Sequence, residues 1–364
     1  MERDIKNIIS HFSIAGEYIS AEKVITGHIN DSFIIKTSST EHPGYFLQWI
    51  NNYIFKDVEG LMNNIAVVTS HLAKKLAEND KLDFKVLEII PCTGGKKFFI
   101  DDEGHYWRLY KFIDKMHVYD VVENTKNAYE GGKAFGIFMS LLADLPADTL
   151  TETIPDFHSM EKRLETFYTS LKNNPFGRVK DIPAEIDFVK SRTELMLTIP
   201  ALIKSGKLPM RITHNDTKFN NILFDETEHA MSIVDLDTVM PGSILFDFGD
   251  AIRTGANTAI EDEKDLSKVD INLSIYEAYT QGFVKSTRHT LTEVEIENLA
   301  FSARFMTFII GLRFLTDFVD GDPYFRTLYP DHNLDRAKVQ FRLVEQMELN
   351  AAKMQEIVLQ SLEK

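Results

Sequence analysis

The first 112 residues contain short apolar runs separated by turn signals, which is the pattern of a small sheet. The β-like runs are residues 32–36, 45–50, 84–90, 97–100 and 106–112. Segments rich in Pro or Gly, notably residues 41–44 and 93–95, divide them. One helix is predicted to begin at Asp57, a suitable N-cap, because apolar residues then recur every three or four positions. These residues are Val58, Leu61, Met62, Ile65, Val68 and Leu72.

After residue 113 the apolar spacing is mostly that of helices. The predicted helices are residues 126–142, 159–171, 184–198, 270–283, 293–318 and 335–362. Two β-like runs, residues 222–224 and 231–234, interrupt them. The pattern predicts an α+β fold with two lobes, a small β-rich N-lobe over residues 1–112 and a larger, mainly helical C-lobe over residues 113–364. Such a two-lobed outline is typical of a cleft enzyme.

Composition and charge narrow the class of function. The 364 residues are 44% hydrophobic and 26% charged, as in an ordinary globular protein. The net charge is −15, of which residues 1–112 carry −2 and residues 113–364 carry −13. Such a charge disfavours nucleic acid and anionic membranes as partners.

Cysteine content and apolar runs point to a cellular compartment. Cys92 is the single cysteine, which excludes an internal disulfide framework and a Cys-based zinc site. The N-terminus has no signal-peptide pattern, and the longest apolar stretches are about eight residues, far short of a membrane span. We expect a cytoplasmic protein without membrane contact and, since no heptad pattern is present, a monomer.

The chemistry is concentrated in residues 212–224. This segment contains the pattern H-x-D-x-x-x-x-N as His214, Asp216 and Asn221, and an apolar run ends at Asp235 shortly afterwards. The pair matches the catalytic loop and metal-binding Asp of protein kinases. P-loop, Rossmann, nucleophile-elbow and zincin motifs do not occur in the sequence.

Each of these residue types suits phosphoryl transfer from ATP. Asp216 can accept the proton of an attacking hydroxyl. Asn221 and Asp235 offer the hard oxygen ligands that Mg²⁺ prefers. Lys218 provides a cation where the transferred phosphoryl group develops charge. His214 is expected to brace the loop, since every chemical role is already assigned.

Three acidic residues near this motif have less specific roles. Asp237 is equally well explained as support for a metal site and as a plain turn residue. Asp247 and Asp250, in Leu-Phe-Asp-Phe-Gly-Asp, are expected to be structural brackets that hold the loop.

The chain resembles the aminoglycoside phosphotransferase and choline kinase-like superfamily over roughly residues 10–360. The resemblance rests on residues 27–31, 47–48, 50–51, 110–113, 213–218, 234–238, 240–243, 245–250, 261–266, 313–315, 321–322 and 324–325. It implies a bilobal, protein-kinase-like fold in which the N-lobe binds nucleotide and the C-lobe carries the catalytic loop. It implies that ATP contacts His28 and Asn30 of a glycine loop and Gln48 on the third strand. It also implies that the hinge residues Lys111, Phe112 and Ile113 contact the nucleotide.

Within the superfamily the chain looks most like the kinases that phosphorylate N-acetylhexosamines at C1. That likeness implies that Asp216 acts on the anomeric hydroxyl of the sugar and that His28, Arg313 and Tyr324 contact the sugar. Simpler roles stay open: His28 could be solvated, Arg313 could pair with Asp317 four residues on, and Tyr324 could pack between lobes.

Two features depart from the protein-kinase pattern. The predicted third strand has Gln48 and no lysine where a kinase places its phosphate-pairing lysine, and neither Lys36 nor Lys56 can be assigned to that role. The glycine loop holds a single glycine, Gly27, so it cradles phosphates more loosely than G-x-G-x-x-G would.

Two other functions therefore remain open. An acidic C-lobe would attract a cationic acceptor such as an aminoglycoside, choline or an amino alcohol, although a guanidinium at residue 313 would oppose it. The missing strand lysine would fit a non-catalytic nucleotide-binding scaffold.

Overall fold

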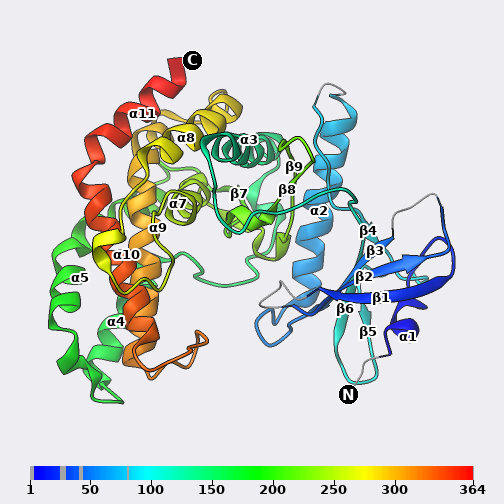
Figure 1. Cartoon of the computed structure of the whole chain (residues 1–364), viewed down its shortest axis with the longest axis horizontal. Helices are drawn as coiled ribbons and strands as arrows, with labels where there is room; N and C mark the ends of the chain where they lie inside the picture. The colour runs from blue at the N-terminus through cyan, green and yellow to red at the C-terminus, as the bar shows by residue number, and fades with distance from the viewer. Residues whose placement is uncertain (1–3, 25–29, 41–43, 80–81, 364) are drawn as a thin grey trace. The chain divides into compact units, whose positions relative to one another are not determined.

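A computed structural model describes residues 4–24, 30–40, 44–79 and 82–363. The chain forms two compact units, each assembled from separate segments (Figure 1). The sheet unit comprises Met1–Val118, Asp148–Ile154 and Leu223–Met240, and the helical unit comprises Tyr119–Ala147, Pro155–Ile222 and Pro241–Lys364. The predicted functional division after residue 112 stays a prediction.

The sheet unit is built on a six-stranded antiparallel sheet with the order β1-β2-β3-β6-β4, in which β5 also pairs with β6. Its strands are β1 (Tyr18–Val24), β2 (Ser32–Thr37), β3 (Tyr45–Ile50), β4 (Ile89–Ile90), β5 (Phe99–Ile100) and β6 (Tyr106–Lys111). A second, two-stranded sheet is formed by β8 (Ile222–Phe224) and β9 (Ala230–Ile233).

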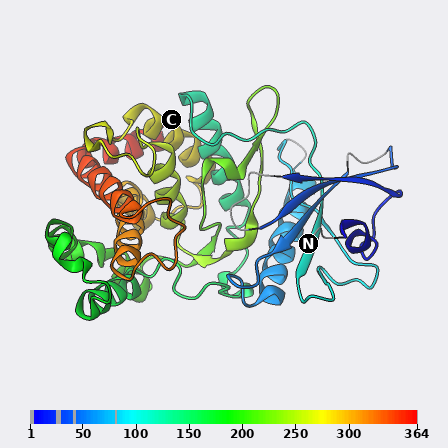
Figure 2. The same cartoon turned by 60° about the horizontal axis from the view of Figure 1, so that its bottom comes forward.

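The two faces of the large sheet carry different side chains because successive residues of a strand point to opposite sides. One face packs Leu47, Trp107 and Leu109 against α1 (Ile5–Ile9), forming a buried apolar core. The helix α2 (Val58–Ala77) lies on the other side of the sheet from α1 (Figure 2). As predicted, Asp57 is its N-cap, and its side chain accepts the backbone N–H of Gly60.

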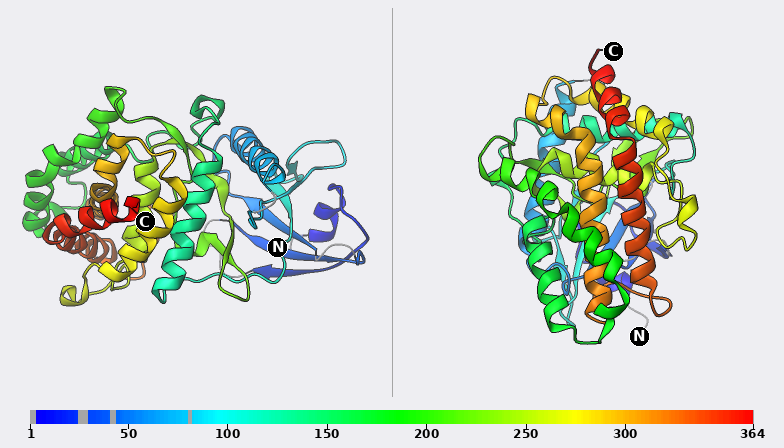
Figure 3. Two further views of the ribbon diagram at one scale, coloured as in Figure 1. Left: turned by 90° about the horizontal axis from the view of Figure 1, so that it is seen from above. Right: turned by 90° about the vertical axis from the view of Figure 1, so that its left-hand side faces the viewer.

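The helical unit contains the remaining long helices. They are α3 (Thr125–Leu141), α4 (Met160–Asn173), α5 (Pro183–Met196), α6 (Thr198–Lys204), α7 (Ile244–Gly255), α8 (Leu273–Thr287), α9 (Glu293–Val319), α10 (His332–Leu349) and α11 (Ala351–Glu363). In the right-hand view of Figure 3, α4 and α5 (green) and α10 (red) surround α9 (orange). Between helices, β7 (Arg211–Thr213) pairs with β10 (Met240–Gly242).

The helix α9 forms the centre of this unit, packed by α4, α7, α10 and α11. Thr292 and Glu295 close its N-terminus as a capping box, and the carboxylate of Glu295 also accepts two bonds from Arg211. Among the described residues, α9 is the one helix long and apolar enough to cross a membrane, but 78% of its most apolar window is buried inside the protein. Its burial is that of a core helix.

The structure confirms the α+β fold class and corrects several predicted elements. The predicted helix over residues 335–362 is two helices, because the chain bends at Asn350, a poor helix former. The predicted strand over residues 84–90 is regular only at Ile89–Ile90. The sequence pattern missed α1, β1, α6, β7, β10 and α7. The helix α7 was missed because the buried Asp247 and Asp250 interrupt an otherwise apolar segment.

Candidate active site

The predicted catalytic loop forms one compact turn of the helical unit. Lys218 places its ammonium nitrogen 3.0 Å from Oδ1 of Asp216. The amide nitrogen of Asn221 donates to the backbone carbonyl of Asp216 at 2.8 Å and lies 3.4 Å from Oδ2 of the same residue. The charge of Asp216 raises the pKa of Lys218, so this lysine is a cation. Three of the predicted site residues therefore meet at one turn.

Asp247 holds this turn from α7. Its two carboxylate oxygens accept the backbone N–H groups of His214 and Asn215, at 2.8 and 2.7 Å, and its carbonyl accepts the hydroxyl of Thr217 at 2.6 Å. Asn215 adopts the left-handed conformation, with φ of 64°. Burial raises the pKa of Asp247 to about 7, and the two backbone amides oppose that rise. Asp247 is the bracket that the sequence predicted.

His214 also braces the loop, as expected. Its ring is completely buried, meets Phe135 and Phe138 edge-on, and accepts the backbone N–H of Asp216 on Nδ1 at 3.3 Å. Its position leaves the imidazole behind the loop, where it orients Asp216.

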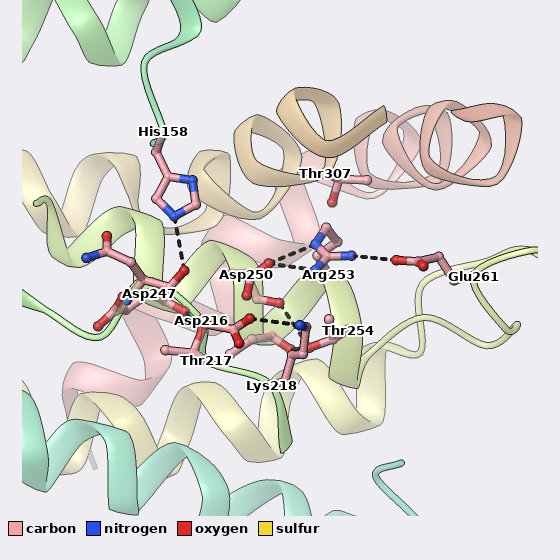
Figure 4. A network of polar contacts seen from close by, with 12 residues as sticks. His158, Asp216, Thr217, Lys218, Asp247, Asp250, Arg253, Thr254, Glu261 and Thr307 are labelled. Carbon is pink, nitrogen blue, oxygen red and sulfur yellow. Dashed lines mark hydrogen bonds and ion pairs between the residues drawn. The ribbon is translucent and has the colours of Figure 1, made fainter. Parts of the chain in front are cut away.

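A second carboxylate of α7 joins the loop to a chain of charges (Figure 4). Asp250 accepts two bonds from Arg253, at 2.9 and 2.8 Å, and Arg253 lies 3.7 Å from Glu261. Burial favours the neutral form of Asp250, but Arg253 and Lys218 hold its pKa below the ordinary value. Asp250 is therefore an anion that helps to fix the charge of Lys218.

His158 supports the loop from the segment before α4. Nε2 of its ring lies 3.1 Å from the backbone carbonyl of Asn215, immediately before Asp216. A carbonyl only accepts, so Nε2 carries the proton and Nδ1 is bare. The ring is packed between Phe157 and Phe246, and burial lowers its pKa to about 4. It is neutral at neutral pH.

Arg313 and Tyr324, predicted to contact a sugar, lie side by side in the helical unit. Nη2 of Arg313 is 3.5 Å from the phenol oxygen of Tyr324. The guanidinium also lies 5.4–5.6 Å from the ring centres of Phe157, Tyr324 and Phe325. Burial, followed by the charge of Arg163, lowers the pKa of Arg313 to about 10. At neutral pH Arg313 and its neighbour Arg163 are both cations.

Arg163 is the second of these two cations. Its Nη2 donates to the backbone carbonyls of Phe157 and Asp156, at 3.0 and 3.3 Å. Burial lowers the pKa of Arg163 as well. Tyr324 and Asp156 act on the pKa of Arg163 in the opposite sense to burial.

The contacts of Asp317 exclude the ion pair with Arg313 that the sequence left open. Its carboxylate accepts the backbone N–H groups of Tyr324 and Phe325, at 2.9 and 3.0 Å, and the amide of Asn333 at 2.9 Å. No ion pair joins Asp317 to Arg313 between these two described side chains, so the surface-pair alternative is wrong. Tyr324 is 66% exposed.

In the sheet unit, Gln48 and Asn30 belong to one buried polar network. Gln48 on β3 is directly opposite Arg108 on β6, and its amide oxygen accepts Nε and Nη2 of that arginine at 3.1 and 2.9 Å. Arg108 also forms an ion pair with Asp237. The other oxygen of Asp237 accepts the amide of Asn30 at 2.8 Å. Asp237 is thus a buried partner of Arg108 and more than a turn residue.

The predicted hinge is partly engaged within the sheet unit. The backbone N–H of Lys111 donates to Glu88, and that of Phe112 donates to Gly44, at 2.9 and 3.1 Å. Two of the three hinge amides are therefore already used within the sheet unit. The prediction for His28 lies outside the described residues.

The donor atoms of Asn221 and Asp235 fit a hard divalent cation. Asn221 commits its amide nitrogen to Asp216, so its carbonyl oxygen is the group left for a ligand. Asp235 sits in a left-handed backbone conformation, with φ of 58°, at the start of a short turn. Among the described residues no three His, Cys, Asp or Glu side chains form a metal cluster. Each of the two residues by itself therefore offers a hard oxygen donor of the kind that Mg²⁺ prefers.

Comparison with known proteins identifies the family. Residues 71–270, more than half of the chain, match APH, the phosphotransferase enzyme family. The chain belongs to this family. The matched region includes the catalytic loop, the turn at Asp235 and α7, and it therefore covers the predicted chemistry of the phosphotransferase.

Solved structures share the fold of this phosphotransferase at low sequence identity. A microcompartment-associated aminopropanol kinase is 13% identical with a TM-score of 0.63, covering 96% of this chain and 97% of its own. Spectinomycin phosphotransferase APH(9)-Ia, with ADP and spectinomycin, is 13% identical with a TM-score of 0.58, covering 96% and 98%. Amicoumacin kinase hAmiN, with AMP-PNP, Ca²⁺ and Ami, is 12% identical with a TM-score of 0.55, covering 90% and 88%.

Sequence reasoning missed four charged or titratable residues that the phosphotransferase structure brings into these networks. They are Arg108, His158, Arg163 and Arg253. Arg108 was detectable only through the register of β3 and β6, which places it opposite Gln48. His158 and Arg163 lie far from the motif in sequence, and no local pattern links them to the loop.

Proposed function

We propose that this phosphotransferase transfers the γ-phosphoryl group of ATP to the C1 hydroxyl of an N-acetylhexosamine, giving the sugar 1-phosphate and ADP. The observation that carries the proposal is the Arg313–Tyr324 pair in the same unit as Asp216. Asp250 links the two groups, because its charge acts on Arg313 as well as on Lys218. Guanidinium and phenol groups donate hydrogen bonds to the carbonyl and hydroxyl oxygens of an acetamido sugar.

The mechanism follows from the residues of the loop. Asp216 orients the acceptor hydroxyl and receives its proton as the oxygen attacks phosphorus. Lys218 can leave Asp216 for the equatorial oxygens of the transferred group, where it neutralises developing charge. Mg²⁺ held by Asn221 and Asp235 would shield the charge of the ATP phosphates. Asp247, His214 and His158 keep the loop rigid during the reaction.

A cationic acceptor is the second candidate. The related structures include an aminopropanol kinase and a spectinomycin phosphotransferase, and the net charge of −15 would attract an amine. The two cations beside Tyr324 argue against this candidate, because Arg163 and Arg313 would repel an ammonium group at close range.

A coupled ADP-release assay with four acceptors separates the candidates. N-acetylglucosamine and N-acetylgalactosamine are compared with choline and kanamycin, each with Mg²⁺ and with EDTA. We expect release with the N-acetyl sugars and loss of turnover in EDTA. Phosphorus NMR of the product then distinguishes an anomeric phosphate from a phosphate at C6. Release with choline or kanamycin alone would favour the second candidate, and transfer to any acceptor would exclude a non-catalytic scaffold.

A further inference from the structure

The sheet face that carries Gln48 holds a buried positive charge. In β3 the side chains of Phe46, Gln48 and Ile50 share this face, and the register sets Arg108 directly opposite Gln48. Side chains directly opposite in an antiparallel pair have Cβ atoms about 5 Å apart. A cation on β6 at this rung therefore lies beside the position where a protein kinase carries its lysine on β3.

Arg108 is completely engaged by groups of the same unit. Its guanidinium bonds Gln48 twice and Asp237 once, and it stacks 5.3 Å from the ring centre of Tyr110. Only 1% of its surface is exposed, so it does not reach a ligand directly. Burial would lower the pKa of Arg108, but the carboxylate of Asp237 raises it above its ordinary value. The residue is a permanent buried cation.

The partners of Arg108 are adjacent to predicted nucleotide and metal groups. Asp237 lies two residues after Asp235, on the same turn, and its second oxygen accepts the amide of Asn30. The carbonyl oxygen of Asn30 in turn accepts the backbone N–H of Asn51 at 3.0 Å. One buried arginine therefore fixes, through a single carboxylate, both the turn of Asp235 and Asn30 of the predicted glycine loop.

Arg108 also brings a positive charge close to two carboxylates. It forms an ion pair with Asp237, and the charge of Asp235 acts on it as well. This cation reduces the repulsion of the two carboxylates for each other and for phosphate groups.

We propose that Arg108 is a positioning residue for nucleotide and metal, supplying from β6 the buried positive charge that is absent from β3. It acts by clamping Asp237, which orients the turn of Asp235 and holds Asn30 at the end of the glycine loop. This inference rests on the proposed function, since it assumes that ATP binds to this unit. It also explains why Gln48 is tolerated on β3: its amide bridges Arg108 to the hydroxyl of Ser32 at 3.1 Å.

The test compares a single substitution with an exchange across the rung. Arg108→Gln removes the cation, and the double variant Gln48→Lys, Arg108→Gln moves a cation to β3 while keeping an amide on β6. Binding of a fluorescent ADP analogue is titrated with Mg²⁺ present, together with steady-state kinetics. We expect Arg108→Gln to weaken nucleotide binding by at least about tenfold, as for groups that orient metal ligands. KM for ATP should rise while KM for the acceptor changes less than about twofold.

The exchange variant and a control separate positioning from stability. The exchange should recover most of the lost nucleotide affinity, which a purely structural role would not require. Arg192→Gln breaks a half-buried bidentate pair with Glu348 in the helical unit and should lower Tm without changing nucleotide binding. Should Arg108→Gln fail to fold, the exchange variant decides: affinity near that of the natural chain supports the proposal, and a loss greater than about tenfold overturns it.

The outcomes also separate this proposal from the proposed function. Unchanged nucleotide affinity in Arg108→Gln would overturn the role of Arg108 alone. An unmodified chain that binds no nucleotide would contradict the kinase proposal itself, before any variant is considered.

Discussion

Asp216 is the residue on which the proposed chemistry depends most directly. Asp216→Asn keeps the size of the side chain and its contact with Asn221, but it removes the group that accepts the proton. We predict that kcat for the favoured acceptor falls by roughly 10²–10⁴. ADP release at saturating substrates measures the change, with nucleotide binding as a control for folding. Near-full turnover would remove Asp216 from the mechanism.

His158 makes stability depend on pH in a calculable way. Its folded pKa of about 4 lies below the ordinary 6.5, so the unfolded chain binds a proton first as pH falls. Its contribution to stability is complete above pH 6.5 and is lost as pH falls toward 4. Asp250, Arg313 and Arg163 surround the ring and act on its pKa after burial.

His158→Gln tests this dependence, since a glutamine amide can still donate to the carbonyl of Asn215 but does not titrate. We predict that the natural chain loses roughly 2–3 kcal/mol more unfolding free energy than the variant between pH 7 and pH 4.5. Urea unfolding at the two pH values gives both numbers. Asp247, whose raised pKa acts in the opposite sense, is common to both chains and cancels in the difference. Parallel curves would contradict the prediction.

The sequence revealed the residues whose roles are local and missed those whose roles depend on pairing. Asp216, Lys218 and Asn221 are close in the chain, so their spacing already implied one turn. Arg108 and Gln48 are sixty residues apart, and only the strand register brings them together. In the sequence alone, the absence of a lysine on β3 was therefore only a departure from the protein-kinase pattern.

Among the elements, α3 and α8 pack most closely. Each helix presents a glycine to the backbone of the other: a Cβ at Gly132 would lie 2.1 Å from the carbonyl oxygen of Tyr279, and one at Gly282 would lie 2.1 Å from that of Tyr129. A backbone carbonyl oxygen cannot move away from an added methyl group as the end of a flexible side chain can. The two helices therefore approach to a distance that only glycine permits.

Gly282→Ala should destabilise the protein by about 3 kcal/mol, since the added methyl group forces two helices apart. Chemical denaturation measures the change. Gly94→Ala is a matched control, because a Cβ at Gly94 would meet no atom within 4 Å and its stability should change little. Equal stabilities of the two variants would show that the helices separate without cost.

Element prediction failed where burial is two-sided or where the chain turns without a strong signal. The helix α7 is buried along most of its length and carries two carboxylates within an apolar segment, so its residues were interpreted only as brackets for the loop. In contrast, α2 has a clear stripe and a capping Asp, and it was predicted at its correct start.

At the scale of the whole molecule, the net charge of −15 produces repulsion that salt can screen. We predict that Tm rises by a few degrees between low and physiological salt at pH 7.5, because isolated surface ion pairs offset little of this repulsion. Scanning fluorimetry across a salt series measures the shift. The same series near the isoelectric point of about 5.2 is the control, where the effect should shrink. A fall in Tm with salt at pH 7.5 would contradict the prediction.

The fold class was predictable because a sheet pattern and a helix pattern occupy different parts of the chain. Which segments form each unit was not predictable, because the sheet unit also includes Asp148–Ile154 and Leu223–Met240 from the mainly helical part of the chain. Those segments contribute β9 and the turn at Asp235, so the linear order of the chain conceals which residues fold together.

The burial of α9 has a consequence for synthesis of the chain. Two of the helices that cover it, α10 and α11, are made after it, so a ribosome-bound chain displays a 27-residue apolar helix before its cover exists. Such a segment is a natural target for chaperones, and in their absence for aggregation. Trimming of residues 332–363 by a protease would recreate that exposure in a finished molecule. The last two helices thus shield α9 from solvent, although they carry none of the predicted catalytic groups.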